Sequence, residues 1–365
     1  MSLNPLNWIK SKKFTTVDFG HYSIKSIQGT KSGKEAKILG GSAERVPEAA
    51  IADGQLEDIP RVVEILEKIF NELPSSPGRI VFSPICGREY VRRITVPDMP
   101  EDELQEAVRW EIEKHLDKPS EATAYDYLLL GKNEGEQVLL LVVLDQSELN
   151  RYEEVFEELS YTPQTASIQD MALVSLMEYQ EECDDSFMIL NMGAKRTKIM
   201  IARYDDFYLS RTVELGGDDF TEIFENRGMS YAEAEREKRD SELKTESGEM
   251  ETDELAIESG FEDFEAEEEE VDFIPLADQL VSEVNRSLDF FTSRFSDDSL
   301  QRVYYTGGGF ALKGLEDYLE RNIELSVNPL SPFAGFAGNK PSGIPEASMA
   351  VAAGLLAGEV IHDES

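Results

Sequence analysis

One short pattern occurs twice in this 365-residue chain, about half a chain length apart. It reads FTTVDFGHYSIKSIQ at residues 14–28 and FMILNMGAKRTKIMI at residues 187–201, an offset of 173 positions. Each copy predicts an apolar strand, a tight turn that contains glycine, and a second strand. Two copies of this unit favour a fold with two similar lobes that face one another across a cleft.

The repeat also pairs polar residues of the two copies. Asp18 corresponds to Asn191, and Lys25 corresponds to Lys198. Glycine in each turn lets main-chain N–H groups approach an anion closely, and a carboxylate oxygen such as that of Asp18 is a ligand that Mg²⁺ prefers. One turn alone would fit an ordinary β-hairpin better. The two turns, together with a third glycine-rich segment described next, predict a phosphate site where Asp18 could hold Mg²⁺ directly or through water.

A third glycine-rich segment lies near the end of the chain. The sequence VYYTGGGFALKGLEDYLE at residues 303–320 predicts an apolar strand, three glycines and then directly an amphipathic helix. Such a turn presents main-chain N–H groups and the positive end of a helix to a phosphate or a flat ring. The spacing matches neither GxGxxG nor a P-loop. The near-match GTKSGK at residues 29–34 is one residue short of a P-loop and predicts only a hairpin turn.

Apolar runs of strand length alternate with stretches of helical periodicity, which predicts an α/β protein. The expected strands are residues 14–17, 23–28, 79–83, 90–96, 138–144, 187–190, 198–203, 207–213 and 302–306, and the expected helices are 59–73, 101–116, 146–159, 169–179 and 281–295.

The chain is strongly acidic, with 74 Asp and Glu against 35 Lys and Arg and a net charge of −39. This balance argues against a nucleic-acid partner, which requires a basic surface, and favours basic partners. Residues 240–272 hold sixteen acids and one base, which predicts a solvated insertion that a short Gly/Ser linker could replace without lowering the melting temperature.

No apolar run is long enough to span a bilayer and no secretion signal is recognisable, so we expect a cytoplasmic protein with Cys86 and Cys183 as free thiols.

Several segments, taken in order, resemble the actin-like ATPase superfamily and, within it, the PilM family of type IV pilus assembly proteins. The two hairpins are similar to the phosphate hairpins of that superfamily, and residues 306–315 (TGGGFALKGL) to its adenosine motif. Further matching segments are ITVPDMPEDELQEAVRWEIEKHL at 94–116, GGDDF at 216–220, AEREK at 234–238, LVSEVNRSLDFFTSR at 280–294 and SMAVAAGLLAG at 348–358. The resemblance implies an actin-like (ribonuclease H-like) two-lobed fold with the inserted subdomain found in PilM and FtsA.

The same resemblance implies a domain layout. The first lobe would comprise residues 1–185, with its core at about 11–85 and 160–185 and an inserted subdomain at about 86–150. The second lobe would comprise residues 186–365, with its core at about 186–216 and 300–360. A small subdomain at about 217–299 would carry the acidic insertion 240–272.

The resemblance also implies ATP and Mg²⁺ between the lobes. The residues it assigns to the nucleotide are Asp18, Gly20, His21, Ser23, Lys25, Asn191, Gly193, Thr197, Gly216, Gly217, Glu235, Lys238, Gly307, Gly308 and Gly309. Two departures from the family pattern weaken the case for turnover: Asn191 replaces an acid, and Ser167-Ile168-Gln169 replaces a segment that tends to carry Asp and Glu. Gln169 could still orient a water molecule, so we expect a slow ATPase at most.

By resemblance, the function is that of a scaffold on the cytoplasmic side of the type IV pilus inner-membrane platform, held at the membrane through a partner. The partner would be the N-terminal cytoplasmic segment of a PilN-like membrane protein, docked near residues 88–130, with other platform proteins or a second copy as further partners. Trp110 lies off the apolar stripe of the helix predicted at 101–116 and is a candidate anchor, although packing against a neighbouring strand would explain it equally well.

Three alternatives belong to other functional classes. The first is a filament-forming actin homologue like FtsA, although the final residues GEVIHDES do not form an amphipathic membrane helix. The second is a type II secretion component like GspL, which would need a following transmembrane helix. The third is a sugar or acetate kinase of the same superfamily, for which no catalytic acid beside a small-molecule pocket is identifiable.

Overall fold

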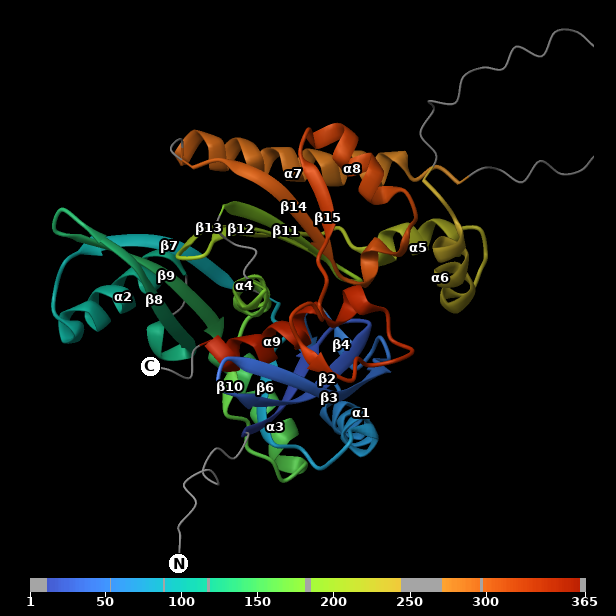
Figure 1. Ribbon diagram of the computed structural model, residues 1–365, viewed down its shortest axis with the longest axis horizontal. Helices are drawn as coiled ribbons and strands as arrows, with labels where there is room; N and C mark the ends of the chain where they lie inside the picture. Colours follow the sequence, from blue (N-terminus) through green and yellow to red (C-terminus); the bar gives the residue numbers. More distant parts are fainter. Residues whose placement is uncertain are drawn as a thin grey trace, which may run out of the picture.

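The computed structural model describes residues 12–52, 54–87, 89–116, 119–180, 185–243, 271–295 and 298–361. Two large sheets lie one above the other with a pair of helices between them, and a smaller sheet with its own helix projects to one side (Figure 1). The two large sheets define two lobes, as the repeat predicts.

The first lobe is built on a six-stranded sheet of order β10-β6-β1-β2-β3-β16. Its antiparallel strands are β1 (Lys12–Phe19), β2 (Ser23–Ser32) and β3 (Glu35–Arg45). The parallel strands are β6 (Arg79–Ser83), β10 (Thr165–Ala166) and β16 (Ala337–Gly338), and β4 (Ile51–Ala52) and β5 (Gln55–Leu56) form a separate small hairpin. Helices α1 (Ile59–Glu72) and α3 (Gln146–Glu158) cover one face of the sheet and enclose an aromatic cluster of Phe19, Phe82, Tyr152 and Phe156.

The second lobe repeats this arrangement with a five-stranded sheet of order β13-β12-β11-β14-β15. Its strands are β11 (Ser186–Met192), β12 (Thr197–Arg203), β13 (Asp206–Val213), β14 (Leu300–Thr306) and β15 (Ser326–Pro329). Its helices are α5 (Gly217–Glu225), α6 (Tyr231–Asp240), α7 (Ile274–Arg294) and α8 (Leu315–Ile323), and the 3₁₀ turn η3 (Gly308–Ala311) lies between β14 and α8. In both lobes an antiparallel three-strand meander is followed by parallel strands, so the sequence repeat corresponds to equivalent hairpins.

Two helices lie between the large sheets. Helix α4 (Gln169–Tyr179) and helix α9 (Ala350–Ile361), the latter preceded by η4 (Glu346–Met349), share one buried apolar cluster with residues of both sheets. Phe14 and Val81 contribute from the first sheet, and Ile189 and Met200 contribute from the second. The two lobes therefore have a continuous core across their inner faces.

The side sheet is antiparallel, with order β7-β9-β8. It contains β7 (Tyr90–Pro97), β8 (Thr123–Asn133) and β9 (Glu136–Asp145), with α2 (Glu101–His115) on one face and η2 (Ser120–Ala122) before β8. We call this unit the inserted subdomain. On its other face Leu140 joins the core shared by the lobes, and the side chain of Arg93 pairs with Asp206 on β13. The subdomain thus contacts both lobes; the domain boundaries proposed above stay predictions.

The strands and helices expected by residue range overlap observed elements, but the long strands β3 and β8 and the short strands β4, β5, β10, β15 and β16 were not expected. GTKSGK ends in the hairpin turn between β2 and β3: its first four residues belong to β2, and Gly33 (φ +63°) and Lys34 form the turn. The expectation that an amphipathic helix follows the three glycines directly is wrong, because η3 intervenes and α8 begins only after Gly314.

The predicted acidic insertion lies mostly outside the described residues, at 244–270. Its described ends are packed, because Leu243 belongs to the core of the second lobe and the partly buried Val271 packs against that core. The prediction that this segment is dispensable therefore applies to 244–270 alone. Within the described ranges, no helix combines the length and the apolar character that crossing a bilayer requires.

The close packing of α9 on α4 generates a prediction about stability. A Cβ atom on Gly354 would lie within 3.0 Å of the Ala172 main chain, a separation that real Cβ atoms essentially never show, whereas one on Gly358 would make only ordinary contacts with Ser175. We expect Gly354→Ala to lower the free energy of unfolding by about 1–3 kcal/mol through overpacking, partly offset by the better helix propensity of alanine. Gly358→Ala is the matched control on the same helix and should be neutral or slightly stabilising. Equal denaturation midpoints for the two variants would contradict this interpretation.

Candidate functional site

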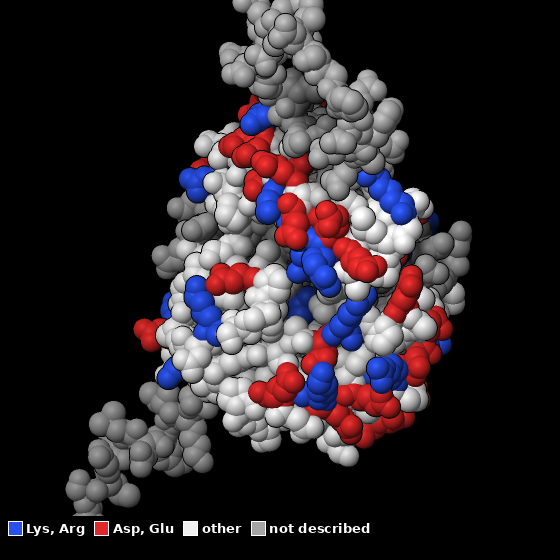
Figure 2. Space-filling model, turned by 90° about the vertical axis from the view of Figure 1, so that its right-hand side faces the viewer, with Lys and Arg blue, Asp and Glu red and all other residues white. Residues whose placement is uncertain are grey.

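A cavity of about 1400 Å³ lies between the two lobes. It is larger than the roughly 300–1000 Å³ of typical small-molecule pockets. On the face drawn in Figure 2, Lys and Arg side chains gather around a hollow in the surface, with Asp and Glu side chains among them. Of the residues predicted to contact a nucleotide or a water molecule, all except Thr197 and Gly216 line this cavity.

Thr197 and Gly216 do not line the cavity, but they hold together the elements that do. The buried hydroxyl of Thr197 donates to the Leu215 carbonyl oxygen at 2.6 Å. Gly216 lies so close to the Ala194 main chain that any side chain would collide with it, and the Gly216 amide donates to Asp219 at 2.7 Å. These contacts hold the start of α5 against the turn of the second hairpin.

The first hairpin places a buried carboxylate in the cavity. Lys25 Nζ lies 3.0 Å from Asp18 Oδ2 and also donates to the Ser23 carbonyl oxygen at 3.1 Å. Asp18 Oδ1 is buried and has no hydrogen-bond partner within the described ranges. An unsatisfied buried carboxylate oxygen is costly unless a ligand completes it, so Asp18 fits a cation or a water molecule bound to one.

His21 in the same turn is kept neutral. Burial, together with the positive charges of Arg196 and Lys195, lowers the pKa of His21 from 6.5 to about 4. At neutral pH this side chain can therefore form hydrogen bonds in the cavity without adding a positive charge.

The second hairpin has a different polar chemistry. The Asn191 amide donates to Gln169 Oε1 at 3.3 Å. Lys198 forms ion pairs with Asp170 at the start of α4 and with Glu89 just before β7. Burial alone would lower the pKa of Lys198, but the two carboxylates outweigh it and raise the pKa above its usual value.

This buried cluster of Lys198, Asp170 and Glu89 was missed by sequence reasoning. Burial raises the pKa of Glu89, and the Lys198 ammonium opposes that rise. The repeat already aligned Lys198 with Lys25, and that signal could have identified Lys198 as a candidate. Its acidic partners come from distant parts of the chain, so no local pattern could have identified them.

The glycine turn packs against the second hairpin. Gly307 has φ +96°, and a side chain there would collide with the Met192 main chain. Gly309 likewise lies against Met192 and the Gly193 carbonyl, whereas a Cβ atom on Gly308 would have open space around it. Only glycine fits the first and third positions, and main chain at Gly308 is left facing the cavity.

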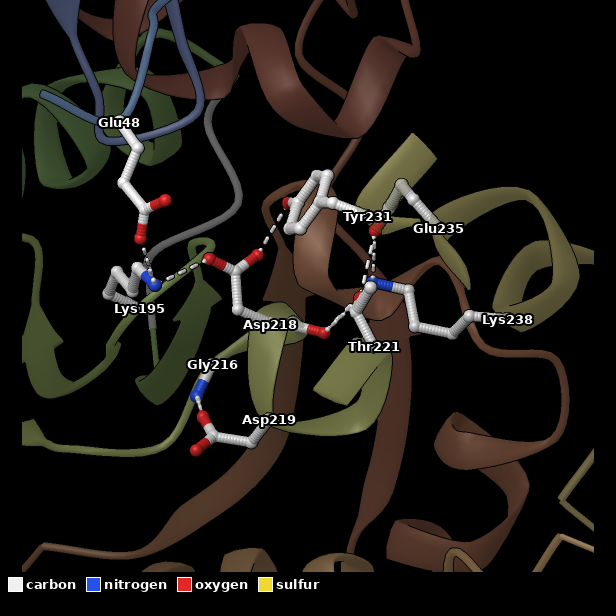
Figure 3. Close-up of polar contacts among 10 residues, drawn as sticks. Glu48, Lys195, Gly216, Asp218, Asp219, Thr221, Tyr231, Glu235 and Lys238 are labelled. Atoms are coloured by element: carbon white, nitrogen blue, oxygen red, sulfur yellow. Dashed lines mark hydrogen bonds and ion pairs between the residues drawn. The ribbon is translucent and has the colours of Figure 1, made fainter. Parts of the chain in front are cut away.

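Lys238 holds α5 and α6 together. Its Nζ atom donates to the Gly217 carbonyl at 2.9 Å, to Thr221 Oγ1 at 2.9 Å and to Glu235 Oε2 at 2.7 Å (Figure 3). An ammonium group has three N–H donors, so all of them are used within the protein. Lys238 therefore positions Glu235 at the cavity wall.

A chain of polar contacts connects the two lobes at the cavity. Lys195 of the second lobe lies 3.8 Å from Glu48 of the first lobe and 3.2 Å from Asp218, which accepts a 2.7 Å hydrogen bond from the Tyr231 hydroxyl (Figure 3). The Arg45 guanidinium lies 4.9 Å from the centroid of the Tyr231 ring. Sequence reasoning did not single out these residues.

The site fits Mg²⁺ only in a hydrated form. Within the described ranges, no group of three or more His, Cys, Asp or Glu side chains could surround a metal ion. Asp18 could therefore supply one protein oxygen, with water and phosphate oxygens completing the coordination that Mg²⁺ prefers.

The duplicated lobes, the cavity between their paired hairpins and the inserted subdomain define the class of fold as that of the actin-like ATPases. A family model described as type IV pilus assembly protein PilM matches residues 16–357. The chain belongs to this family.

Comparison with solved structures gives the same fold. A structure described as a PilM–PilN type IV pilus biogenesis complex matches with a TM-score of 0.78 and 22% identity, covering 95% of this chain and 98% of that chain. MreB 5 of Spiroplasma citri bound to AMPPNP matches with a TM-score of 0.53 and 11% identity, covering 96% of each chain. The ethanolamine utilization protein EutJ from Carboxydothermus hydrogenoformans matches with a TM-score of 0.53 and 12% identity, covering 97% of this chain and 91% of that chain.

The lowered pKa of His21 generates a prediction about acid stability. Between pH 6.5 and about pH 4 the unfolded chain binds a proton at His21 that the folded chain does not bind, so stability falls as the pH falls through this range. We expect His21→Gln to lose less stability than the wild type over this interval, as measured by urea unfolding at several pH values. His115→Gln, on the surface of α2, is the matched control. Parallel pH profiles for the wild type and His21→Gln would show that His21 is not the group responsible.

Proposed function

We propose that this protein is a cytoplasmic nucleotide-binding scaffold of the type IV pilus inner-membrane platform. The observation that carries the nucleotide part is the buried Asp18 Oδ1 atom, which has no hydrogen-bond partner among the residues that the structure describes. Asp18 lies beside Lys25 in a cavity between two phosphate-type hairpins. The structure of MreB 5, which has the same fold, contains the ATP analogue AMPPNP. Family membership favours the pilus platform over the filament-forming and secretion alternatives.

The chain's own residues suggest an orientation for ATP. Glu235 on α6 and the main chain at Gly308 form the side of the cavity suited to the nucleoside. Lys25 and the main chain of the two hairpin turns offer donors for phosphate oxygens, and Asp18 would hold hydrated Mg²⁺. The bound ion would neutralise phosphate charge. The last phosphate would then lie nearest to Gln169, Lys198 and Glu89.

The second hairpin argues against rapid hydrolysis. Asn191 and Gln169 carry no charge and are hydrogen-bonded to one another, so neither is a base. Gln169 could position a water molecule but could not accept its proton. We therefore expect ATP to be retained for long periods, as suits a scaffold.

Nucleotide binding is tested by thermal stability. A ligand that binds only the folded state at a hundredfold excess over Kd adds about 2.7 kcal/mol of stability. We expect ATP with Mg²⁺ to raise the melting temperature of the wild type and to raise it much less for Asp18→Ala. Asp205→Ala, an exposed acid outside the cavity, is the matched control.

Two results would contradict this part of the proposal. Absence of any shift at millimolar ATP would exclude nucleotide binding. Turnover faster than about 1 s⁻¹, which is within the ordinary enzymatic range, would exclude the slow-ATPase assignment.

The partner is proposed to dock on the inserted subdomain. Large apolar side chains there are exposed to solvent: 61% of Trp110, 51% of Leu128 and 48% of Leu129. The alternative explanation, that Trp110 packs against a neighbouring strand, is therefore wrong. Within the described ranges β8 pairs only with β9, so its other edge is open to an extended peptide.

Charge suggests the chemistry of that peptide. The first turn of α2 carries Glu101, Asp102 and Glu103. The acidic surface should attract a basic segment, and screening over about 8 Å at physiological salt should weaken the attraction as salt rises. The solved PilM–PilN complex supports a PilN-like protein as this partner, and we propose that its N-terminal segment is the part that docks.

Titration of a labelled PilN-like N-terminal peptide tests the docking surface. We expect Trp110→Ala and Leu128→Asp each to weaken binding at least about fivefold, because buried aromatic and apolar anchors dominate interface energies. Tyr204→Ala, which removes an exposed aromatic ring from the second lobe, is the matched control and should bind like the wild type. Unchanged affinity for Trp110→Ala would remove Trp110 from the site. If the wild type does not bind the peptide at any salt concentration, the docking proposal itself is wrong.

A further inference from the structure

The two hairpins carry a lysine at the same position of the repeat, but the two lysines have different partners. In the first hairpin, Asp18 is opposite Lys25 across the strand pair, and the two side chains form an ion pair. In the second, Asn191 is opposite Lys198, and the Asn191 amide donates to Gln169 instead. Because Asn191 carries no charge, Lys198 takes its counter-charges from outside its own hairpin.

Those counter-charges leave part of the Lys198 ammonium group unused. Asp170 and Glu89 accept two of its three N–H groups, and in the described part of the chain the third has no protein acceptor. Lys198 is buried but lines the cavity. Lys198 therefore resembles Lys25 in its position in the repeat and in having an N–H group left for a ligand. The two lysines lie on opposite walls of the cavity.

The two carboxylates differ in how firmly they are held. Asp170 is fully buried at the start of α4 and accepts a second hydrogen bond from the Ser210 hydroxyl at 2.6 Å. Glu89 lies on the segment between β6 and β7, and it lines the cavity, whereas Asp170 does not. An anion that enters the cavity would therefore meet Glu89 as its competitor for Lys198.

We propose that Lys198 is a second phosphate-binding lysine and that the last phosphate of a nucleoside triphosphate displaces Glu89 from it. This inference rests on the nucleotide binding proposed above. No bond is made or broken in the exchange: one oxyanion replaces another on a buried ammonium group.

The exchange would reach the inserted subdomain, because Glu89 directly precedes β7. The same segment is also held by Arg196, whose guanidinium donates to the Cys86 and Gly87 carbonyl oxygens at 3.4 Å. Release of Glu89 from Lys198 would remove one ion pair between the segment that leads into the subdomain and the second lobe. The ion pair between Arg93 and Asp206 would stay in place. Binding of ATP and binding of a partner on the subdomain would then influence one another reciprocally.

Calorimetric titration of the full chain with ATP–Mg²⁺ and with ADP–Mg²⁺ tests the proposal through the ratio of the two affinities. Lys198→Met should lower the preference for ATP about tenfold or more, as loss of a hydrogen bond to a charged group predicts. Glu89→Gln should raise it severalfold, because the amide competes less well than a carboxylate for the ammonium. Glu89→Gln keeps the size of the side chain, so it tests the proposal even if Lys198→Met does not fold.

Two controls separate phosphate binding from general loosening. Lys313→Met removes an exposed ammonium group of the second lobe outside the cavity. Asp206→Asn removes the ion pair that Arg93 of the inserted subdomain forms with the second lobe, and Asp206 also lies outside the cavity. Both should leave the ratio unchanged. Amide hydrogen exchange of residues 84–92 should become faster when ATP binds and should not change when ADP binds.

The outcomes distinguish this inference from the function on which it rests. If the wild type binds neither nucleotide, the proposed function is wrong and the inference fails with it. If the wild type binds both nucleotides but Glu89→Gln leaves the ratio unchanged or lowers it, the displacement of Glu89 is wrong while nucleotide binding stands. If Asp206→Asn changes the ratio of the two affinities as much as Glu89→Gln does, the cause is general loosening of the subdomain. That result would also overturn the inference that a phosphate displaces Glu89.

Discussion

The contact between α4 and α9 is the constraint on which the two-lobed arrangement depends. Each large sheet needs an apolar layer on its inner face, and this one pair of helices supplies that layer to both. Gly354 lets the helices approach until main chain meets main chain, and the small residues around it keep α9 thin enough to lie between the sheets. A thicker pair would separate the hairpins on the opposite walls of the cavity, so the geometry of the site depends on a contact made outside it.

The two hairpins show how one duplicated unit acquires two chemistries. The first keeps its acid and its lysine paired across neighbouring strands, and it retains an unsatisfied carboxylate oxygen for a ligand. Replacing the acid by Asn191 in the second hairpin leaves the strand register intact but redirects Lys198 toward Asp170 and Glu89. A single neutral residue therefore connects the second hairpin to α4 and to the inserted subdomain. Among the described residues, Lys25 makes no such connection, because its acceptors Asp18 and Ser23 belong to its own hairpin.

The repeat and the glycine-rich segment were sufficient to predict the two lobes, and nearly all of the residues that the family resemblance assigned to the nucleotide line the cavity. Many other residues that line the cavity were not predicted. The errors have physical causes. Strand β3 was not expected because glycine and charged residues interrupt the alternation of apolar and polar residues along it. The sheet tolerates this interruption because β3 pairs with a strand on each side, β2 and β16. The helix expected directly after Gly309 begins later, because the glycines turn the chain against Met192 first. Lys238 lines the cavity and its three donors join α5 to α6, and its contact with a nucleotide stays a prediction.

The sequence by itself determined the local features: which segments are strands or helices, where glycine permits a tight turn, and which residues the repeat makes equivalent. These follow from neighbours in the chain, because backbone propensity and side-chain periodicity act over a few residues. Only the tertiary structure decided which charges meet. Glu89, Asp170 and Lys198 lie on three elements that are far apart in the sequence, and burial between the lobes is what makes their pairing necessary. The exposure of Trp110 was decided in the same way, since it depends on which face of α2 the small sheet covers.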